Sequence, residues 1–146
     1  MSEIKEFLRQ IEMFLGLSER MVAEVAKLCR PESYEADHII MERNSPPTHL
    51  YLIREGTVEI NTATDTAATA EGVVVTLGKG QSFGEMGLVD NGTRSATVKA
   101  ATPTDLLAIE CAHLRRLCET DTDLGYLVMR NIASDLSFKL RNRNLI

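Results

Sequence analysis

The sequence of 146 residues has no apolar run of about 20 residues and no stretch with the composition of a signal peptide. We therefore expect no membrane partner and predict a cytoplasmic protein. The 16 basic residues are outnumbered by 21 acidic ones, so the net charge is −5 and the pI is near 5.2. That balance speaks against a general nucleic-acid or anionic-membrane surface. The length fits a single domain, residues 1–146.

The sequence also lacks the patterns of metal, redox and hydrolytic sites. Cys29, Cys111 and Cys118 are odd in number and have no CxxC spacing, which predicts reduced and mostly buried thiols. The three histidines are scattered without HxH or HExxH spacing, so we predict no metal site. GxSxG and Walker-type motifs are missing as well. We therefore predict a binding protein without cofactor rather than an enzyme.

One stretch, residues 80–100, gathers glycines, a carboxylate and a guanidinium: GQSFGEMGLVDNGTRSATVKA. The segment FGEMGL predicts a tight turn that leads into about one helical turn, whose backbone N–H groups favour a phosphate. Arg94 offers a planar charged fork for two phosphate oxygens, while Glu85 only accepts hydrogen bonds and suits a hydroxyl. These residues predict a small anionic ligand with a sugar-like hydroxyl near its phosphate.

The same stretch resembles the phosphate-binding cassette of the cyclic nucleotide-binding domain family. YLIREGTVEI at 51–60 follows the family pattern YxIxxGxVxI, and the resemblance extends over roughly residues 33–110. Two positions depart from the family, because Asp37 and Asn44 stand where relatives usually have glycine. Asn tolerates positive φ better than other non-glycine residues, so we expect Asn44 to keep its turn, whereas the turn at Asp37 is less secure.

The resemblance implies a role for each matching residue. Glu85 holds the ribose 2′-hydroxyl and Arg94 pairs with the cyclic phosphate, while Ser95 adds a hydroxyl to the phosphate or base. Backbone around the glycines completes the cradle, two valines before the cassette form an apolar wall, and the C-terminal helix supplies a lid contact. The predicted ligand-binding set is Phe83, Gly84, Glu85, Met86, Gly87, Arg94, Ser95, Val74, Val75, Lys139 and Leu140.

The identity of the base stays open between two ligands. A hydroxyl residue directly after the cassette arginine, here Ser95, occurs in family members that bind cAMP and in members that use it to hold guanine. Because no guanine-specific acid is present among the other residues, we expect cAMP in preference to cGMP.

The pattern of elements predicts a mainly β fold with flanking helices, an antiparallel β-roll or jelly roll. We expect a helical preface at 1–30, a β-roll at 31–110 with the cassette at 80–100, and C-terminal helices at 111–146. One helix is predicted over 3–15, and a second is predicted to begin after an N-cap at Ser18 and to be stopped by Pro31. The Thr/Ala-rich stretch 62–70 predicts an exposed hairpin tip.

A long C-terminal helix is predicted to open with a capping box at Thr120 and Asp123. Its apolar residues recur every four positions, at Leu124, Val128, Ile132, Leu136 and Leu140. This stripe packs against the domain itself, or its distal half meets the same helix of a second chain in a homodimer; the pattern fits both. Asp135 and Lys139 are expected to form an i,i+4 ion pair.

The sequence is therefore compatible with two functions. In the first, the domain is a sensor whose C-terminal helix closes over the bound nucleotide and reports occupancy to an unknown downstream partner. In the second, it is an interaction or dimerisation module that no longer binds nucleotide. The second reading is motivated by the sequence, which carries no helix-turn-helix, kinase or channel segment to regulate. The intact pair Glu85 and Arg94 favours the first.

Overall fold

The computed structural model describes residues 2–62, 74–90 and 92–142. The chain divides into two compact units. Residues 29–111 form the β unit, and residues 1–28 together with 112–146 form the helical unit. The predicted hairpin tip at 62–70 lies outside the described residues, apart from Thr62.

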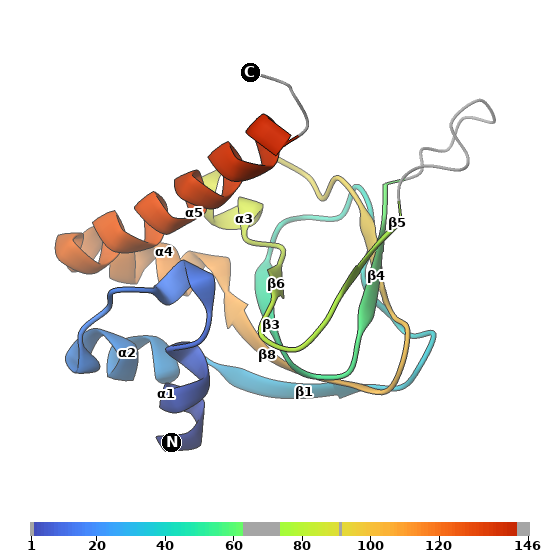
Figure 1. Cartoon of the computed structure of the whole chain (residues 1–146), viewed down its shortest axis with the longest axis horizontal. Coiled ribbons are helices and arrows are strands. Elements are labelled where there is room, and N and C mark those ends of the chain that lie inside the picture. The colour runs from blue at the N-terminus through green and yellow to red at the C-terminus, as the bar shows by residue number, and fades with distance from the viewer. Residues whose placement is uncertain (1, 63–73, 91, 143–146) are drawn as a thin grey trace. The chain divides into compact units, whose positions relative to one another are not determined.

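The β unit contains two antiparallel sheets of four strands each (Figure 1). The first sheet has the order β1-β8-β3-β6 and the second the order β2-β7-β4-β5. The strands of the first sheet are β1 (Arg30–Tyr34), β3 (His49–Glu55), β6 (Ser82–Phe83) and β8 (Thr104–Glu110). Those of the second are β2 (Ile39–Met41), β4 (Val58–Asn61), β5 (Val74–Leu77) and β7 (Thr97–Ala100). This arrangement confirms the predicted mainly β fold, an antiparallel roll with flanking helices.

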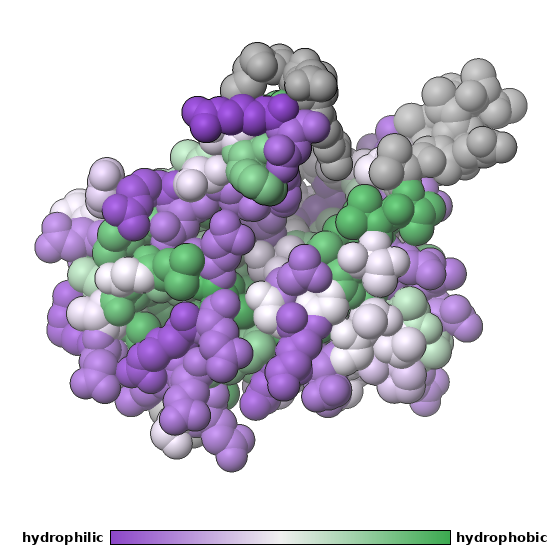
Figure 2. All heavy atoms as spheres, viewed as in Figure 1, coloured by the Kyte–Doolittle hydropathy of each residue, from purple (hydrophilic) through white to green (hydrophobic). Residues whose placement is uncertain are grey.

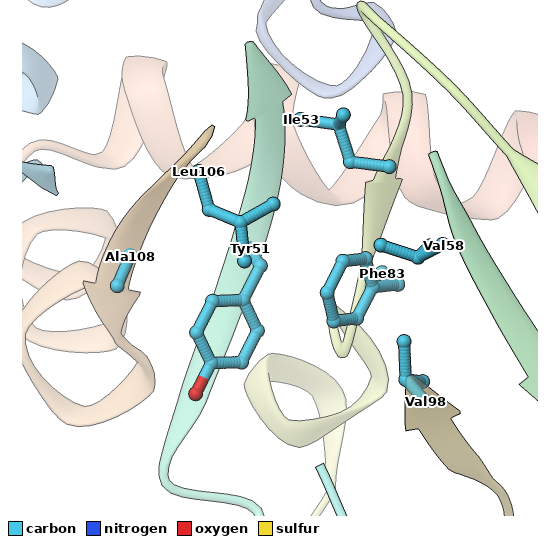
Figure 3. Packing of buried hydrophobic residues seen from close by; sticks show 7 residues of the cluster. All are labelled: Tyr51, Ile53, Val58, Phe83, Val98, Leu106 and Ala108. Atoms are coloured by element: carbon cyan, nitrogen blue, oxygen red, sulfur yellow. The ribbon is translucent and has the colours of Figure 1, made fainter. Parts of the chain in front are cut away.

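The core of the β unit lies between the two sheets (Figure 3). Side chains along a strand point alternately to the two faces of its sheet, so every second residue of a strand faces this core. The buried cluster draws on β3, β6 and β8 from one sheet and on β4 and β7 from the other. Its members are Tyr51, Ile53, Val58, Phe83, Val98, Leu106 and Ala108.

The structure has a strand, β1, where the sequence predicts the end of a helix at Pro31. Pro31 instead lies within β1, which is an edge strand paired only with β8 in the described part of the sheet. Edge strands accept proline because one row of their backbone groups has no neighbouring strand. The helix before it, α2 (Glu19–Ala26), ends earlier than expected and leaves Cys29 outside.

Both departures from glycine in the early turns keep the left-handed backbone. Asn44 has φ +71° and Asp37 has φ +72°. The short polar side chains of Asn and Asp tolerate this region better than other non-glycine residues. The expectation for Asn44 is confirmed, and the turn at Asp37 forms too, with its amide donating to the Ala100 carbonyl at 2.7 Å.

The first helix of the helical unit is shorter than predicted. α1 (Ser2–Leu8) is followed by a turn and a 3₁₀ helix, η1 (Glu12–Phe14), so the single helix over 3–15 is wrong. In a straight helix of 3.6 residues per turn, Met13 would point away from the side that carries Phe7 and Leu8. The break buries Met13 and Phe14 together with that side. The predicted cap of α2 is confirmed, because the Met21 amide donates to Ser18 Oγ at 3.2 Å.

Two helices follow the β unit along the chain: α4 (Cys111–Thr120) and α5 (Thr122–Asn142). The predicted capping box is wrong, because Thr120 ends α4 and its hydroxyl donates to carbonyls of that helix. Asp121 caps α5 instead, accepting the Leu124 amide at 3.2 Å. The short connection between the helices leaves one residue, Asp121, to start the second.

The apolar stripe of α5 changes in burial along its length. Leu124, Val128 and Ile132 are buried, Leu136 is half-buried and Leu140 is exposed. Within the helical unit, α5 is fastened to η1 by Asn131, whose amide donates to the carbonyls of Met13 and Leu15 at 3.0 and 2.9 Å. The proximal half of the stripe is therefore a packing surface.

Candidate functional site

The cassette begins with a turn that only glycine adopts easily. After β6, Gly84 has φ +82°, Glu85 is already helical and α3 (Met86–Val89) makes a single turn. The amides of Gly87 and Leu88 donate to the carbonyls of Gly84 and Glu85 at 3.3 and 3.0 Å. The predicted tight turn leading into about one helical turn is confirmed.

Gly87 is required by space rather than by backbone angle. A Cβ at this position would lie 2.8 Å from Pro47 Cβ and 3.0 Å from the Pro47 carbonyl oxygen. Cβ atoms do not approach other atoms that closely without displacing them. The loop before β3 therefore sets how closely α3 packs against the roll, and that distance positions the turn that carries Glu85.

The backbone of Arg94 is held by two hydrogen bonds to the loop before β3. Its amide donates to the Ser45 carbonyl at 3.0 Å, and its carbonyl accepts from the Asn44 amide at 2.8 Å. The positive φ of Asn44 therefore serves the site as well as the turn. The side chain is only 6% exposed, so its charge is held inside the β unit.

The guanidinium of Arg94 bridges two segments of main chain. Nη1 donates to the Gly84 carbonyl at 3.2 Å, and Nη2 donates to the His49 carbonyl. These bonds aim the guanidinium at the start of the cassette, next to Glu85. An arginine has five N–H donors, so two bonds leave donors for an anion.

Among the residues that the structure describes, two buried polar atoms of the cassette have no hydrogen-bond partner: Glu85 Oε2 and Arg94 Nε. Buried polar groups are nearly always paired, and an unpaired one costs stability. Both residues belong to the cassette, and Arg94 Nη1 bonds to the carbonyl of Gly84, which directly precedes Glu85. An unpaired acceptor and an unpaired donor match a ligand that brings a hydroxyl and an anionic oxygen.

The other predicted ligand-binding residues of the β unit differ in their exposure and in the face of the sheet on which they lie. Phe83 is 3% exposed and stacks on Tyr51, so it is a core residue and presents no surface to a ligand. Ser95 is exposed. Val75 pairs with Ile60, which pairs with the buried Val98, so Val75 shares the inner face of the second sheet.

Val74 points to the opposite face, because consecutive residues of a strand alternate. It is 55% exposed, whereas Val75 is 37% exposed. Figure 2 shows hydrophobic surface at this end of β5. Of the two valines, only Val75 has the orientation that an inner apolar wall requires.

The two predicted lid residues belong to the helical unit. Lys139 is ion-paired with Asp135 at 2.9 Å, which confirms the predicted i,i+4 pair. Leu140 is 39% exposed. Lys139 is thus engaged within its own helix, and Leu140 is the one with free apolar surface.

Burial raises the pKa of two of the thiols. None of the three cysteines, all of which lie within the described residues, forms a disulfide, and burial raises the pKa of Cys29 to about 12. The pKa of Cys118 is raised to about 11, first by burial and then by Glu119 and Asp121. Because the thiolate is the reactive form, both residues act as packing groups.

Over 2–62, 74–90 and 92–142, no group of three His, Cys, Asp or Glu side chains is placed to hold a metal ion. No helix within those residues is long and apolar enough to cross a membrane.

The chain belongs to the cyclic nucleotide-binding domain family, whose model matches residues 31–121. Among curated relatives, a cyclic nucleotide-gated potassium channel of Mesorhizobium japonicum is 29% identical over 115 residues, which are 79% of this chain and 30% of the channel. The cAMP-dependent protein kinase regulatory subunit of Schizosaccharomyces pombe is 29% identical over 127 residues, 87% of this chain and 28% of that protein. The chain thus spans less than a third of these relatives.

Solved structures share the fold. The catabolite activator protein of Thermus thermophilus superposes with a TM-score of 0.75 and 28% identity, covering 92% of this chain and 60% of that one.

Proposed function

We propose that this domain is a sensor that binds a cyclic nucleotide, cAMP in preference to cGMP, without turning it over. The observation that carries the proposal is the pair of buried, unpartnered atoms, Glu85 Oε2 and Arg94 Nε. Glu85 accepts from the ribose 2′-hydroxyl and Arg94 donates to the cyclic phosphate. Family membership supports this ligand class.

Specificity and signalling belong to the same proposal. Val75 forms an apolar wall for the base, Ser95 contacts the phosphate or base, and α5 closes over the ligand with Leu140 as its apolar contact. A ligand shifts an equilibrium only by its difference in affinity for two states. The closed state has the helix contact to the base and the open state lacks it. The downstream partner is a protein, and a homodimer forms through the distal half of α5.

The experiment is a calorimetric titration of the purified chain with cAMP and with cGMP. We expect saturable binding with the tighter affinity for cAMP. The variant Arg94→Ala should lose about 1.5 to 3 kcal/mol of binding free energy, on the order of ten- to hundredfold in affinity, because it removes a charge-assisted contact to the phosphate.

Two results would contradict the proposal. Unchanged affinity in Arg94→Ala would remove this residue from the site. A wild-type chain that shows no heat with either nucleotide up to millimolar concentration would favour the second candidate, an interaction module that does not bind nucleotide.

A further inference from the structure

The bonds of Arg94 place two backbone carbonyls at the centre of the site. One belongs to His49, the first residue of β3, and the other to Gly84, the residue after β6. The guanidinium bonds to both carbonyls. Its position therefore depends on how firmly the two carbonyls are fixed relative to each other.

The backbone pairing between these two strands is short. In the described part of the chain, β3 and β6 share two paired positions, Tyr51 with Phe83 and Leu52 with Ser82. Backbone bonds of Ile53 to Gln81 and Gly80, both at 2.9 Å, continue the pairing away from the site. Toward the His49 and Gly84 carbonyls, the paired positions end at Tyr51 and Phe83. Side-chain contacts across the strands therefore contribute much of what keeps the His49 and Gly84 carbonyls in register.

The main side-chain contact across this pairing is an aromatic stack. The rings of Tyr51 and Phe83 have centroids 5.0 Å apart and an interplanar angle of 22°. Figure 3 shows the two rings side by side, one from each strand. The His49 ring continues the row, with its centroid 6.2 Å from that of Tyr51 at 29°. Tyr51 lies two residues after His49, and Phe83 lies one residue before Gly84.

We infer that Tyr51 and Phe83 are positioning residues for ligand binding: their stack holds the His49 and Gly84 carbonyls that aim the Arg94 guanidinium at the phosphate. The inference rests on the proposed function for its consequence in affinity. It also accounts for Phe83, which lies next to the cassette and yet is buried.

The charges around Tyr51 agree with this placement. Burial raises the pKa of the Tyr51 phenol, and Glu32 raises it further. The positive charge of Arg94 acts in the opposite direction and lowers the same pKa. Arg94 is therefore near enough to the ring to influence it electrostatically.

The test is a double-mutant cycle between the stack and Arg94, measured as cAMP affinity. Tyr51→Leu removes one ring, and Arg94→Lys keeps the charge but loses the fork that reaches both carbonyls. Alone, Tyr51→Leu should weaken binding roughly three- to tenfold, which is what an aromatic pair contributes beyond its buried area. In the Arg94→Lys background, Tyr51→Leu should have little further effect on cAMP affinity, because the guanidinium that the stack positions is absent.

Two further variants separate positioning from general stability. Tyr51→Phe keeps the ring and should restore the affinity lost in Tyr51→Leu. Ile53→Ala also removes a fully buried side chain from β3 and the same core cluster, but it is not part of the stack. It should lower the unfolding temperature and leave the affinity close to that of the wild type.

The same cycle on thermal unfolding of the ligand-free protein distinguishes failure of this inference from failure of the proposed function. Positioning predicts that the two changes are also non-additive in stability, because Arg94 and the stack hold the same carbonyls. Additive effects in both measurements, or an affinity loss in Ile53→Ala equal to that in Tyr51→Leu, would overturn the inference. Coupling in stability with no cAMP or cGMP binding by the wild type would keep the positioning of Arg94 and overturn the proposed ligand.

Discussion

Gly84 and Gly80 offer a matched pair of substitutions that separates backbone strain from damage to the site. Both lie in the cassette, with φ +82° and φ +88°. A Cβ added at Gly80 meets nothing within 4 Å. A Cβ added at Gly84 lies 3.0 Å from the His49 carbonyl oxygen and 3.2 Å from Arg94 Nη1. The same alanine therefore meets open space at one position and the binding machinery at the other.

The expected magnitudes follow from these contacts. Alanine in the left-handed region costs about 1 to 2 kcal/mol, and this term is common to both variants. Gly84→Ala adds steric crowding, which in well-packed sites costs about 1 to 3 kcal/mol. We therefore expect Gly80→Ala to lose about 1 to 2 kcal/mol of unfolding free energy and Gly84→Ala about 2 to 5 kcal/mol.

The effect on the ligand should differ more sharply than the effect on stability. Crowding at Gly84 must move the His49 carbonyl or the guanidinium by a few tenths of an ångström. A misaligned but still charged Arg94 should cost roughly tenfold in cAMP affinity, about 1.4 kcal/mol. Gly80→Ala should bind cAMP as the wild type does.

The assay combines urea unfolding of the ligand-free protein with a cAMP titration of all three proteins. Unfolding gives the two stability losses, and titration gives the affinities in conditions where each variant is folded. Equal affinities for the two variants would refute the reasoning, because the contacts of Gly84 would then have no bearing on the site.

Two remaining predictions concern single carboxylates. Bonds from the Leu124 amide and from Arg20 hold the pKa of Asp121 below its usual range, so its contribution to stability is complete above the unfolded pKa of about 3.9 and is lost as the pH falls through the lower folded value. Acid unfolding curves should show this loss in the wild type and not in Asp121→Asn, and identical curves would contradict it. Glu85→Ala removes a buried oxygen that has no partner. It should therefore weaken cAMP binding without lowering the unfolding temperature of the ligand-free protein, and a marked drop in that temperature would show that the carboxylate stabilises the fold.

Local signals in the sequence were enough to predict the backbone conformation of the cassette. The turn at Gly84, the single helical turn after it and the positive φ of Asn44 each depend on what one residue type does to its own backbone. The mainly β character of the roll was also predicted, because alternation along a strand records which face is buried. Glu85 and Arg94 were identified as a pair by residue type and order.

Features that depend on tertiary neighbours were missed. Pro31 usually ends regular structure, and its strand β1 is possible only because it lies at a sheet edge. The break after Leu8 buries Met13, which a single helix would have exposed. The aim of Arg94 depends on the carbonyl of His49, 45 positions away, and a carbonyl has no signature in a sequence. The role of Phe83 as a core residue was missed for the same reason.

The two charged residues of the site differ in what they reveal about function. Arg94 bonds to the carbonyls of His49 and Gly84 in the ligand-free protein, so a domain that had lost its ligand would still benefit from keeping it. Glu85 Oε2 has no such partner. Buried unpaired acceptors are costly, and residues that reduce stability persist where function requires them. Glu85 is therefore the stronger argument for a nucleotide sensor over an interaction module, even though Arg94 makes the larger number of contacts.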